Sequence, residues 1–275
     1  MAVVSLKNKV KSRSMLAGTP AFGFNPSSIA WMWYDAADTS TISVSGTAVT
    51  QWNNKGASGV NLTQGTAANR PTSGTTTLNG RNVISYDGGD VLLGTTPADW
   101  KFLHDGTNYV LGFVAKAATV ADPENDLQLL SNIRRADAGQ IGRSIQHESR
   151  STNVDMLRTY VANGTGSFFV INQEANNVWD SDNPVVYTEL TDPDNATAAN
   201  RMYSYFGTGA AIQNNTQTNA VSTSNPGLNM GIGATDQALQ GITGYIAELV
   251  IIRGTDATET NRVALRDYLK LKWGL

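Results

Sequence analysis

The stretch of sequence that decides the fold is YIAELVII, at residues 245–252. Most of it is β-branched or aromatic, the residue types that favour strands. A continuous apolar run of this length predicts a strand buried on nearly both faces. Glu248 interrupts the run, and we expect its side chain to point to an outer or concave face of the sheet. A second stretch, YVLGFV at residues 109–114, has the same character. The core is therefore predicted to be β-sheet.

Outward from these two stretches, the chain reads as short strand candidates separated by glycine, asparagine, aspartate and proline. Only 16% of the 275 residues are charged and 26 are glycine. Helical bundles and coiled coils need far more alanine, leucine and charged helix formers, so these classes are excluded. Strands follow strands without helical patterns between them, which is typical of an antiparallel sandwich or barrel. The sequence therefore predicts an all-β domain.

Only the C-terminal stretch is convincingly helical. Asp256 and Glu259 have the spacing of a capping box, and Gly274 is a stop signal. One face of the predicted helix is apolar and another is basic, with Leu265, Tyr268, Leu269 and Trp273 on the first and Arg262, Arg266 and Lys270 on the second. We expect the apolar face to pack on the β domain.

The composition excludes several classes of protein. There is no cysteine, which rules out a disulfide framework, a thiolate zinc site and a cysteine nucleophile. His104 and His147 are the only histidines, so a multi-histidine metal site is excluded. The sequence has no run of eighteen apolar residues, and residues 1–7 lack the order of a signal peptide. A net charge of −3 and a pI near 5.4 argue against nucleic-acid binding by the body of the protein.

Charge is distributed unevenly along the chain. Residues 1–25 contain no acid and four basic residues at alternate positions, Lys7, Lys9, Lys11 and Arg13. This segment carries +4, so the remaining chain carries −7. The segment can be a solvated tail, an arm lying extended on an acidic neighbouring subunit, or a contact for nucleic acid. Prolines and serines mark a linker that ends near residue 28. The predicted organisation is an arm and linker over 1–28 and one domain over 29–275.

Seven short motifs carry a resemblance to a known family: WYDAADTSTI (33–42), VTQWNNKG (49–56), NRP (69–71), LNGR (78–81), VISYDG (83–88), GYIAELVI (244–251) and YLKLKWGL (268–275). This succession resembles the concanavalin A-like lectin/glucanase (laminin-G-like) domains of tailed-phage virion proteins and bacterial surface proteins. The resemblance covers residues 29–275 and implies a jelly roll of two curved antiparallel sheets. Independently of the resemblance, the residue types predict that three aromatic side chains anchor the core, because each can bury a large area: Trp33, Trp52 and Tyr86.

Candidate catalytic residues are sparse. Members of the family that cleave glycans place two or three carboxylates on one strand. Here the nearest pattern is Glu124 and Asp126, which lack a third acid, while Glu148 and Glu248 stand alone on their strands. The sequence also has no Gly-x-Ser-x-Gly nucleophile elbow, although two histidines are present. We therefore predict a protein that is not an enzyme.

The sequence offers residues for two kinds of binding site, one for calcium and one for a sugar. Acidic loops at residues 180–183 and 192–195 offer oxygen ligands for calcium, but such loops also form turns without a metal. The 180–183 loop is the better calcium candidate; we expect no bound cofactor. Sugar binding needs an aromatic platform beside amides and carboxylates, and Asn176, Trp179 and Asp180 offer these together.

The leading functional interpretation is a non-enzymatic auxiliary structural protein of a phage virion, displayed on capsid or tail, with a lectin-like body. The alternative is a glycan- or receptor-binding module of a tail fibre or cell surface, and the third reading is a glycoside hydrolase. The expected partners are other virion proteins, with cell-surface glycan as a further candidate and no membrane. We expect a homo-oligomer, made in the host cytoplasm and located in the virion, with the basic arm as its anchor.

Overall fold

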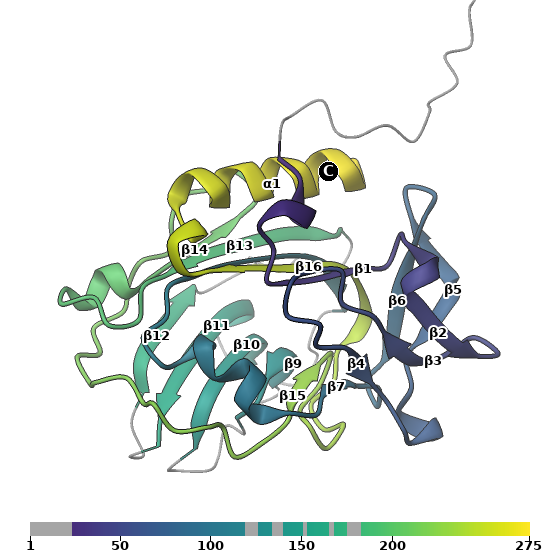
Figure 1. Cartoon of the computed structure of the whole chain (residues 1–275), viewed down its shortest axis with the longest axis horizontal. Coiled ribbons are helices and arrows are strands. Elements are labelled where there is room, and N and C mark those ends of the chain that lie inside the picture. Colours follow the sequence, from purple (N-terminus) through teal and green to yellow (C-terminus); the bar gives the residue numbers. More distant parts are fainter. Residues whose placement is uncertain (1–23, 119–125, 134–139, 151–152, 165–167, 175–182) are drawn as a thin grey trace, which may run out of the picture.

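The computed structural model describes residues 24–118, 126–133, 140–150, 153–164, 168–174 and 183–275. The described strands form two facing antiparallel layers with one helix on the outer side of the first layer (Figure 1). The layer under the helix, here called the helix-side layer, contains β6 (Arg81–Asp87), β16 (Thr243–Arg253), β8 (Tyr109–Ala117), β13 (Val185–Thr191) and β14 (Met202–Phe206), with β1 (Met32–Asp35) paired to β16. The predicted all-β sandwich with one C-terminal helix is confirmed.

The opposite layer holds the remaining long strands. It contains β12 (Phe168–Glu174), β11 (Asn153–Asn163), β10 (Ile141–Arg150), β9 (Asp126–Ser131), β15 (Met230–Ile232) and β7 (Leu92–Gly94). Short strands at one side connect the two layers, namely β4 (Leu62–Thr63), β3 (Ala48–Trp52), β2 (Ile42–Ser45) and β5 (Thr72–Leu78). Every pairing between these described strands is antiparallel.

The helices are short apart from the last. Among the described residues there are six 3₁₀ helices, η1 (Pro26–Ser28), η2 (Thr39–Thr41), η3 (Ala67–Asn69), η4 (Pro97–Leu103), η5 (Ala198–Arg201) and η6 (Gly254–Asp256), and one α-helix, α1 (Glu259–Trp273). None of the helices in the described part of the chain is long and apolar enough to cross a membrane.

The main hydrophobic core lies between the two layers. Phe113, Ile246 and Leu249 enter it from the helix-side layer, and Ile145 and Leu157 enter it from the opposite layer. All five side chains are buried, as strand alternation requires for the inner face of a sandwich. The expected anchors Trp33, Trp52 and Tyr86 are buried as well.

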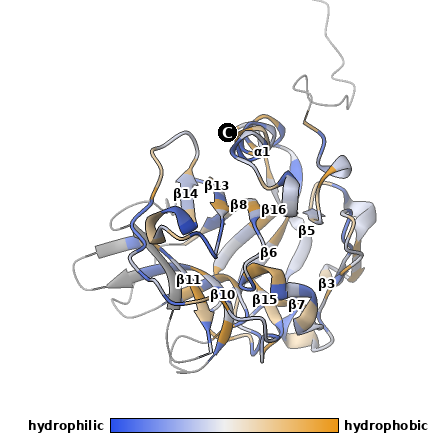
Figure 2. Ribbon diagram, turned by 60° about the vertical axis from the view of Figure 1, so that its left-hand side comes forward, coloured by the Kyte–Doolittle hydropathy of each residue, from blue (hydrophilic) through white to orange (hydrophobic). Residues whose placement is uncertain are grey.

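A second core lies between α1 and the outer face of the helix-side layer. Figure 2 views α1 nearly end-on, above β13, β8 and β16. Leu265, Tyr268, Leu269 and Trp273 are buried there, as their spacing predicted. The helix ends at Gly274, whose φ of 69° is left-handed, so the predicted stop is confirmed.

Two details of α1 differ from the prediction. The N-cap is Thr258, whose hydroxyl accepts a hydrogen bond from the Asn261 amide at 3.2 Å, because Asp256 belongs to the preceding 3₁₀ turn. Arg262 belongs to the predicted basic face, yet it is only 2% exposed. Its guanidinium stacks on the Tyr205 ring and donates to Thr188, which draws this residue towards the sheet.

Candidate functional site

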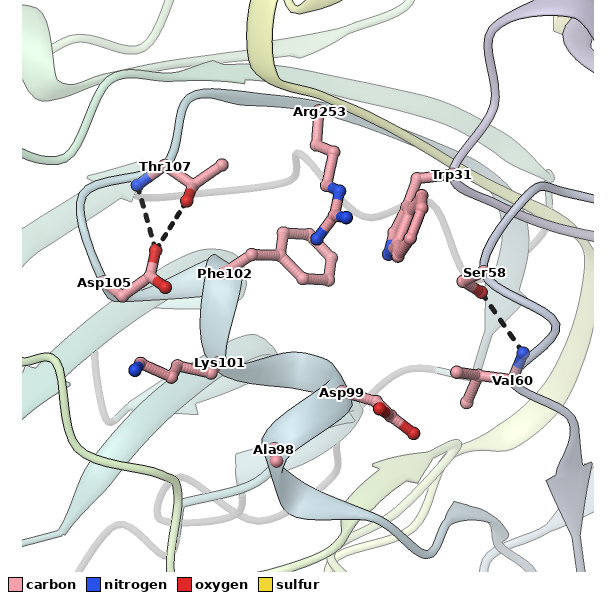
Figure 3. A pocket seen from close by; sticks show the side chains of 10 residues that line it. All are labelled: Trp31, Ser58, Val60, Ala98, Asp99, Lys101, Phe102, Asp105, Thr107 and Arg253. Atoms are coloured by element: carbon pink, nitrogen blue, oxygen red, sulfur yellow. Dashed lines mark hydrogen bonds between the residues drawn. The ribbon is translucent and has the colours of Figure 1, made fainter.

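A surface pocket of about 220 Å³ opens at the end of the sandwich where β1 starts and β16 ends (Figure 3). Four segments far apart in the sequence supply its walls: Trp31 before β1, Ser58 and Val60 from the β3–β4 loop, Ala98, Asp99, Lys101 and Phe102 from η4 with Asp105 and Thr107 just after it, and Arg253 at the end of β16. We call it the Trp31 pocket.

The backbone fixes Trp31 in this wall. The Trp31 amide donates to the Ile251 carbonyl at 2.8 Å, which continues the pairing of β1 with β16. The Trp31 carbonyl accepts from the Ser58 amide at 2.9 Å. Gly56 makes this approach of the loop feasible, because a Cβ there would lie 2.6 Å from the same carbonyl oxygen. The aromatic wall is therefore held by β1, β16 and the β3–β4 loop together.

Arg253 lies between two aromatic rings. Its guanidinium carbon is 3.3 Å from the centroid of the Trp31 ring and 5.6 Å from that of Phe102 (Figure 3). Such stacking orients the planar guanidinium and leaves its edge free to donate. Its backbone pairs with Tyr109 on β8, whereas no hydrogen bond or ion pair joins the guanidinium to any residue that the structure describes. Burial lowers the pKa of Arg253, and the nearby Asp105 carboxylate opposes that effect.

The rim beside Arg253 is a rigid turn. Asp105 accepts hydrogen bonds from the Thr107 amide at 3.1 Å and from the Thr107 hydroxyl at 2.7 Å, and Gly106 between them has a φ of 96°. Asp99 and Lys101 on η4 complete the charged lining, so two basic and two acidic side chains face the pocket and their formal charges cancel.

The pocket is rich in hydrogen-bond donors. Besides the Arg253 guanidinium, the indole Nε1 of Trp31 is buried and has no acceptor among the described residues. A buried donor without a partner loses solvation that a ligand oxygen can restore. The volume is below the roughly 300–1,000 Å³ typical of pockets for drug-sized ligands. The pocket thus suits a small, neutral, oxygen-rich ligand, about one sugar ring in size.

No motif in the sequence points to this pocket. The residues predicted to bind glycan and those of the predicted arm lie outside the described residues, namely Asn176, Trp179 and Asp180, and Lys7, Lys9, Lys11 and Arg13. Trp31 precedes β1 directly and Arg253 is the last residue of β16, and the antiparallel pairing of these strands brings the two residues together. A tryptophan just before one strand and an arginine at the end of another were the available signals.

Two of the carboxylates considered for catalysis do meet. Asp126 on β9 and Glu148 on β10 are direct cross-strand partners. Both are fully buried, and Arg158 Nη1 lies 3.3 Å from each carboxylate oxygen of Glu148. Glu248 faces outward from the core as expected, but it is buried under α1 rather than lining a cleft.

The two histidines are buried. His104 Nε2 lies 2.9 Å from the Ser224 carbonyl, and His147 on β10 pairs with Asp155 at 2.7 Å. Burial lowers the pKa of both imidazoles. Within the described ranges no three His, Asp or Glu side chains gather as metal ligands would. Residues 180–182 of the calcium candidate lie outside those ranges.

No protein-family model and no curated protein sequence matches this chain. Solved structures do match its fold. A GH54 α-L-arabinofuranosidase soaked with a cyclic sulfate inhibitor aligns with a TM-score of 0.52 and 12% identity, over 81% of this chain and 50% of that one. The binding domain of botulinum neurotoxin DC in complex with SialylT aligns with a TM-score of 0.52 and 9% identity, over 90% of this chain and 52% of that one.

A Trypanosoma rangeli sialidase in complex with 2,3-difluoro-KDN also has a TM-score of 0.52, with 8% identity, over 89% of this chain and 33% of that one. This chain therefore spans about a third to a half of the length of these three structures. At such identities the similarity shows the fold, a β-sandwich shared with glycosidases and with a glycan-bound domain.

Proposed function

We propose that this protein is a non-enzymatic carbohydrate-binding module whose ligand occupies the Trp31 pocket. The observation that carries the proposal is the stacked Arg253 guanidinium, which offers its donors to the pocket beside the unpaired indole N–H of Trp31. Hydroxyl groups of a sugar can accept from both donors, while Asp99 and Asp105 can accept from other hydroxyls. The fold shared with the sialidase and the toxin binding domain supports this class of ligand.

The non-enzymatic part rests on the state of the carboxylates. A glycosidase needs an acid and a second carboxylate that flank the scissile bond. Asp126 and Glu148 are opposite each other, but both are buried and Glu148 is paired with Arg158. Glu248 accepts hydrogen bonds from three aromatic side chains under α1. These environments suit structural carboxylates better than catalytic ones.

A glycan array with the whole chain tests the binding proposal, followed by calorimetric titration of the best glycan. Arg253→Ala should weaken that binding by roughly ten- to a hundredfold, the effect of losing a charged hydrogen-bond donor. Trp31→Phe should also weaken it, since it removes Nε1–H and keeps a ring. The control is Arg81→Ala, which removes an exposed arginine at the start of β6. No glycan bound by the wild type, or equal binding by Arg253→Ala, would refute the proposal.

The finer role in a phage virion is proposed on the resemblance of the sequence motifs to phage virion domains, and the anchoring to other subunits is proposed on the uneven charge. A +4 segment precedes a body of −7. A basic segment of this kind can bind an acidic neighbouring subunit. Removal of residues 1–23 should leave a folded body that no longer joins its assembly. Replacing Lys7, Lys9, Lys11 and Arg13 by glutamine should have the same effect if charge is the cause. Normal occupancy of particles by both variants would contradict this role.

A further inference from the structure

Three ionisable side chains from distant parts of the chain meet under the C-terminal end of α1. Asp35 on β1 and Glu248 on β16 are direct cross-strand partners. Lys272 on α1 reaches over this pair, with its Nζ 2.6 Å from Asp35 Oδ1 and 2.8 Å from Glu248 Oε2. The lysine nitrogen is therefore in contact with both carboxylates at once.

The surroundings of the triad are dry and aromatic. The side chains of Lys272, Asp35 and Glu248 are 12%, 7% and 0% exposed. The indole nitrogens of Trp33 and Trp273 and the hydroxyl of Tyr268 donate to Glu248 at 2.6–2.9 Å. Removing water from an ammonium and a carboxylate disfavours their charged forms relative to a neutral amine and acid.

We propose that Lys272 and Asp35 condense to an amide, so that an intramolecular cross-link joins α1 to β1 with Glu248 as the proton carrier. The modification needs only groups that are already in contact. It is independent of the proposed carbohydrate binding, which concerns the other end of β1.

The step balances without any co-reactant. One proton moves from Lys272 Nζ to Asp35 Oδ1, which gives an amine and a carboxylic acid without a change in total charge. The amine lone pair attacks Cγ of Asp35, and Glu248 Oε2 takes a second proton from Nζ. Glu248 passes that proton to the Oδ1 hydroxyl, which leaves as water while the C–N bond replaces the C–O bond. The products are one amide and one water, and Glu248 is restored.

Lys55 and Glu248 both assist this chemistry. Lys55 Nζ lies 2.9 Å from Asp35 Oδ2, the oxygen on which negative charge grows during the attack, and its ammonium stabilises that charge. Burial raises the pKa of Glu248, and the nearby Lys272 ammonium opposes this effect. A buried carboxyl with a raised pKa holds a proton more tightly than an exposed one, which suits it to general acid–base work.

Geometry selects Lys272 over Lys55 as the nucleophile. Lys55 also touches Asp35, but its second partner is Asp38, at 2.8 Å, whose side chain is 35% exposed. Although burial opposes it, hydrogen bonds and charge interactions with Asp38 and Asp35 raise the pKa of Lys55 and keep its ammonium charged. Lys272 instead shares its contact with the fully buried Glu248. The bond would close a loop between residues 237 positions apart in a chain without cysteine.

Intact-mass spectrometry of the whole chain tests the proposal, on fresh protein and after a week of incubation. The wild type should be about 18 Da lighter than its sequence, the mass of one water, and a digest should contain one branched peptide holding residues 35 and 272. Lys272→Arg should keep the ion pair and show the full mass. Asp35→Asn should lose ammonia instead, about 17 Da. Glu248→Gln should fold but form the link more slowly or not at all.

One other reaction would cause the same loss of mass, and these variants distinguish it from the cross-link. Asp87-Gly88 and Asp105-Gly106 can lose water to form succinimides. That loss would persist in Lys272→Arg and would map to peptides containing those pairs. A wild-type chain of full mass after incubation, or a water loss that survives Lys272→Arg, would overturn the cross-link.

Discussion

The indole Nε1–H of Trp273 donates a 2.7 Å hydrogen bond to Glu248 Oε2, joining the last turn of α1 to the middle of β16. The other oxygen of the same carboxylate accepts from Trp33 at 2.6 Å and from Tyr268 at 2.9 Å. One buried carboxylate therefore connects β16, β1 and two turns of the helix. This explains why an acid stands in the most apolar strand of the protein. The helix is a docked part of the sandwich, with its tryptophan at the centre of the contact.

Trp273→Ala should lower the free energy of unfolding by about 3–5 kcal/mol, because the ring is fully buried. Trp273→Phe keeps most of the apolar contact and loses the hydrogen bond to Glu248, so its cost should be smaller, about 1–3 kcal/mol. Urea unfolding of both variants measures these values. If α1 served instead as an exposed oligomer contact, Trp273→Ala would lose assembly at nearly normal stability. A shift below about 1 kcal/mol would refute the docking argument.

Gly112→Ala should also weaken the docking of the helix. Gly112 lies on β8 directly under α1, and a Cβ there would be 2.8 Å from Leu265 Cδ2 and 3.2 Å from Leu269 Cδ1. Both leucines are fully buried and cannot move away without disturbing the second core, so we expect a cost of about 1–3 kcal/mol. The matched control is Gly65→Ala, where a Cβ has no neighbour within 4 Å. Equal effects of the two substitutions on urea unfolding would argue against close packing at Gly112.

The β-sandwich and the face of α1 could be predicted because both depend on local patterns. Apolar runs at residues 109–114 and 245–252 became the central strands β8 and β16, and the spacing of Leu265 to Trp273 defined the buried face of α1. The predicted N-cap of α1 was wrong because Asp256 and Thr258 are both good cap residues. Which of them caps depends on the preceding 3₁₀ turn.

The Trp31 pocket could not be predicted from such patterns. Its tryptophan and arginine are more than two hundred positions apart and meet because β1 pairs with β16 in one register. Strand pairing also brings together Asp126 and Glu148. In the sequence, Asp126 is grouped with Glu124, and Glu148 stands alone on its strand. The sequence supplies residue types for such sites, but strand register determines which of them meet.

A buried ion pair across the sandwich leads to another prediction. Arg143 on β10 donates to Glu189 on β13 at 2.7 Å, and both side chains are fully buried. Arg143→Met leaves the Glu189 charge without its partner and should cost about 3–5 kcal/mol. Adding Glu189→Leu removes that charge, so the double variant should recover most of the loss. Urea unfolding of the two single variants and the double variant completes the cycle. Simple additivity of the two single effects would show that the pair is not coupled.

The turn between β6 and β7 should make stability depend on pH through Asp90. Burial, together with the neighbouring Asp87 charge, raises the pKa of the Asp90 carboxyl from 3.8 to about 6. Because the folded state then binds this proton more tightly than the unfolded state, the stabilisation is complete below about pH 4 and is lost as the pH rises through about 6. Asp90→Asn should remove this dependence and keep an oxygen that accepts from the Asp87 amide, a bond of 3.0 Å in the wild type.

Asp90→Asn should therefore raise the free energy of unfolding only at pH values above the raised pKa of Asp90. A shift of two units corresponds to about 3 kcal/mol, and we expect about 1–2 kcal/mol because Asp87 and its surroundings are exposed and solvent screens the charges. Urea unfolding at about pH 4 and about pH 7.5 measures the difference on both sides of the titration. Asp87→Asn removes the neighbouring charge and should recover part of the gain while Asp90 is kept. If Asp90→Asn changes stability equally at both pH values, the Asp90 carboxyl does not titrate with a raised pKa in the folded protein.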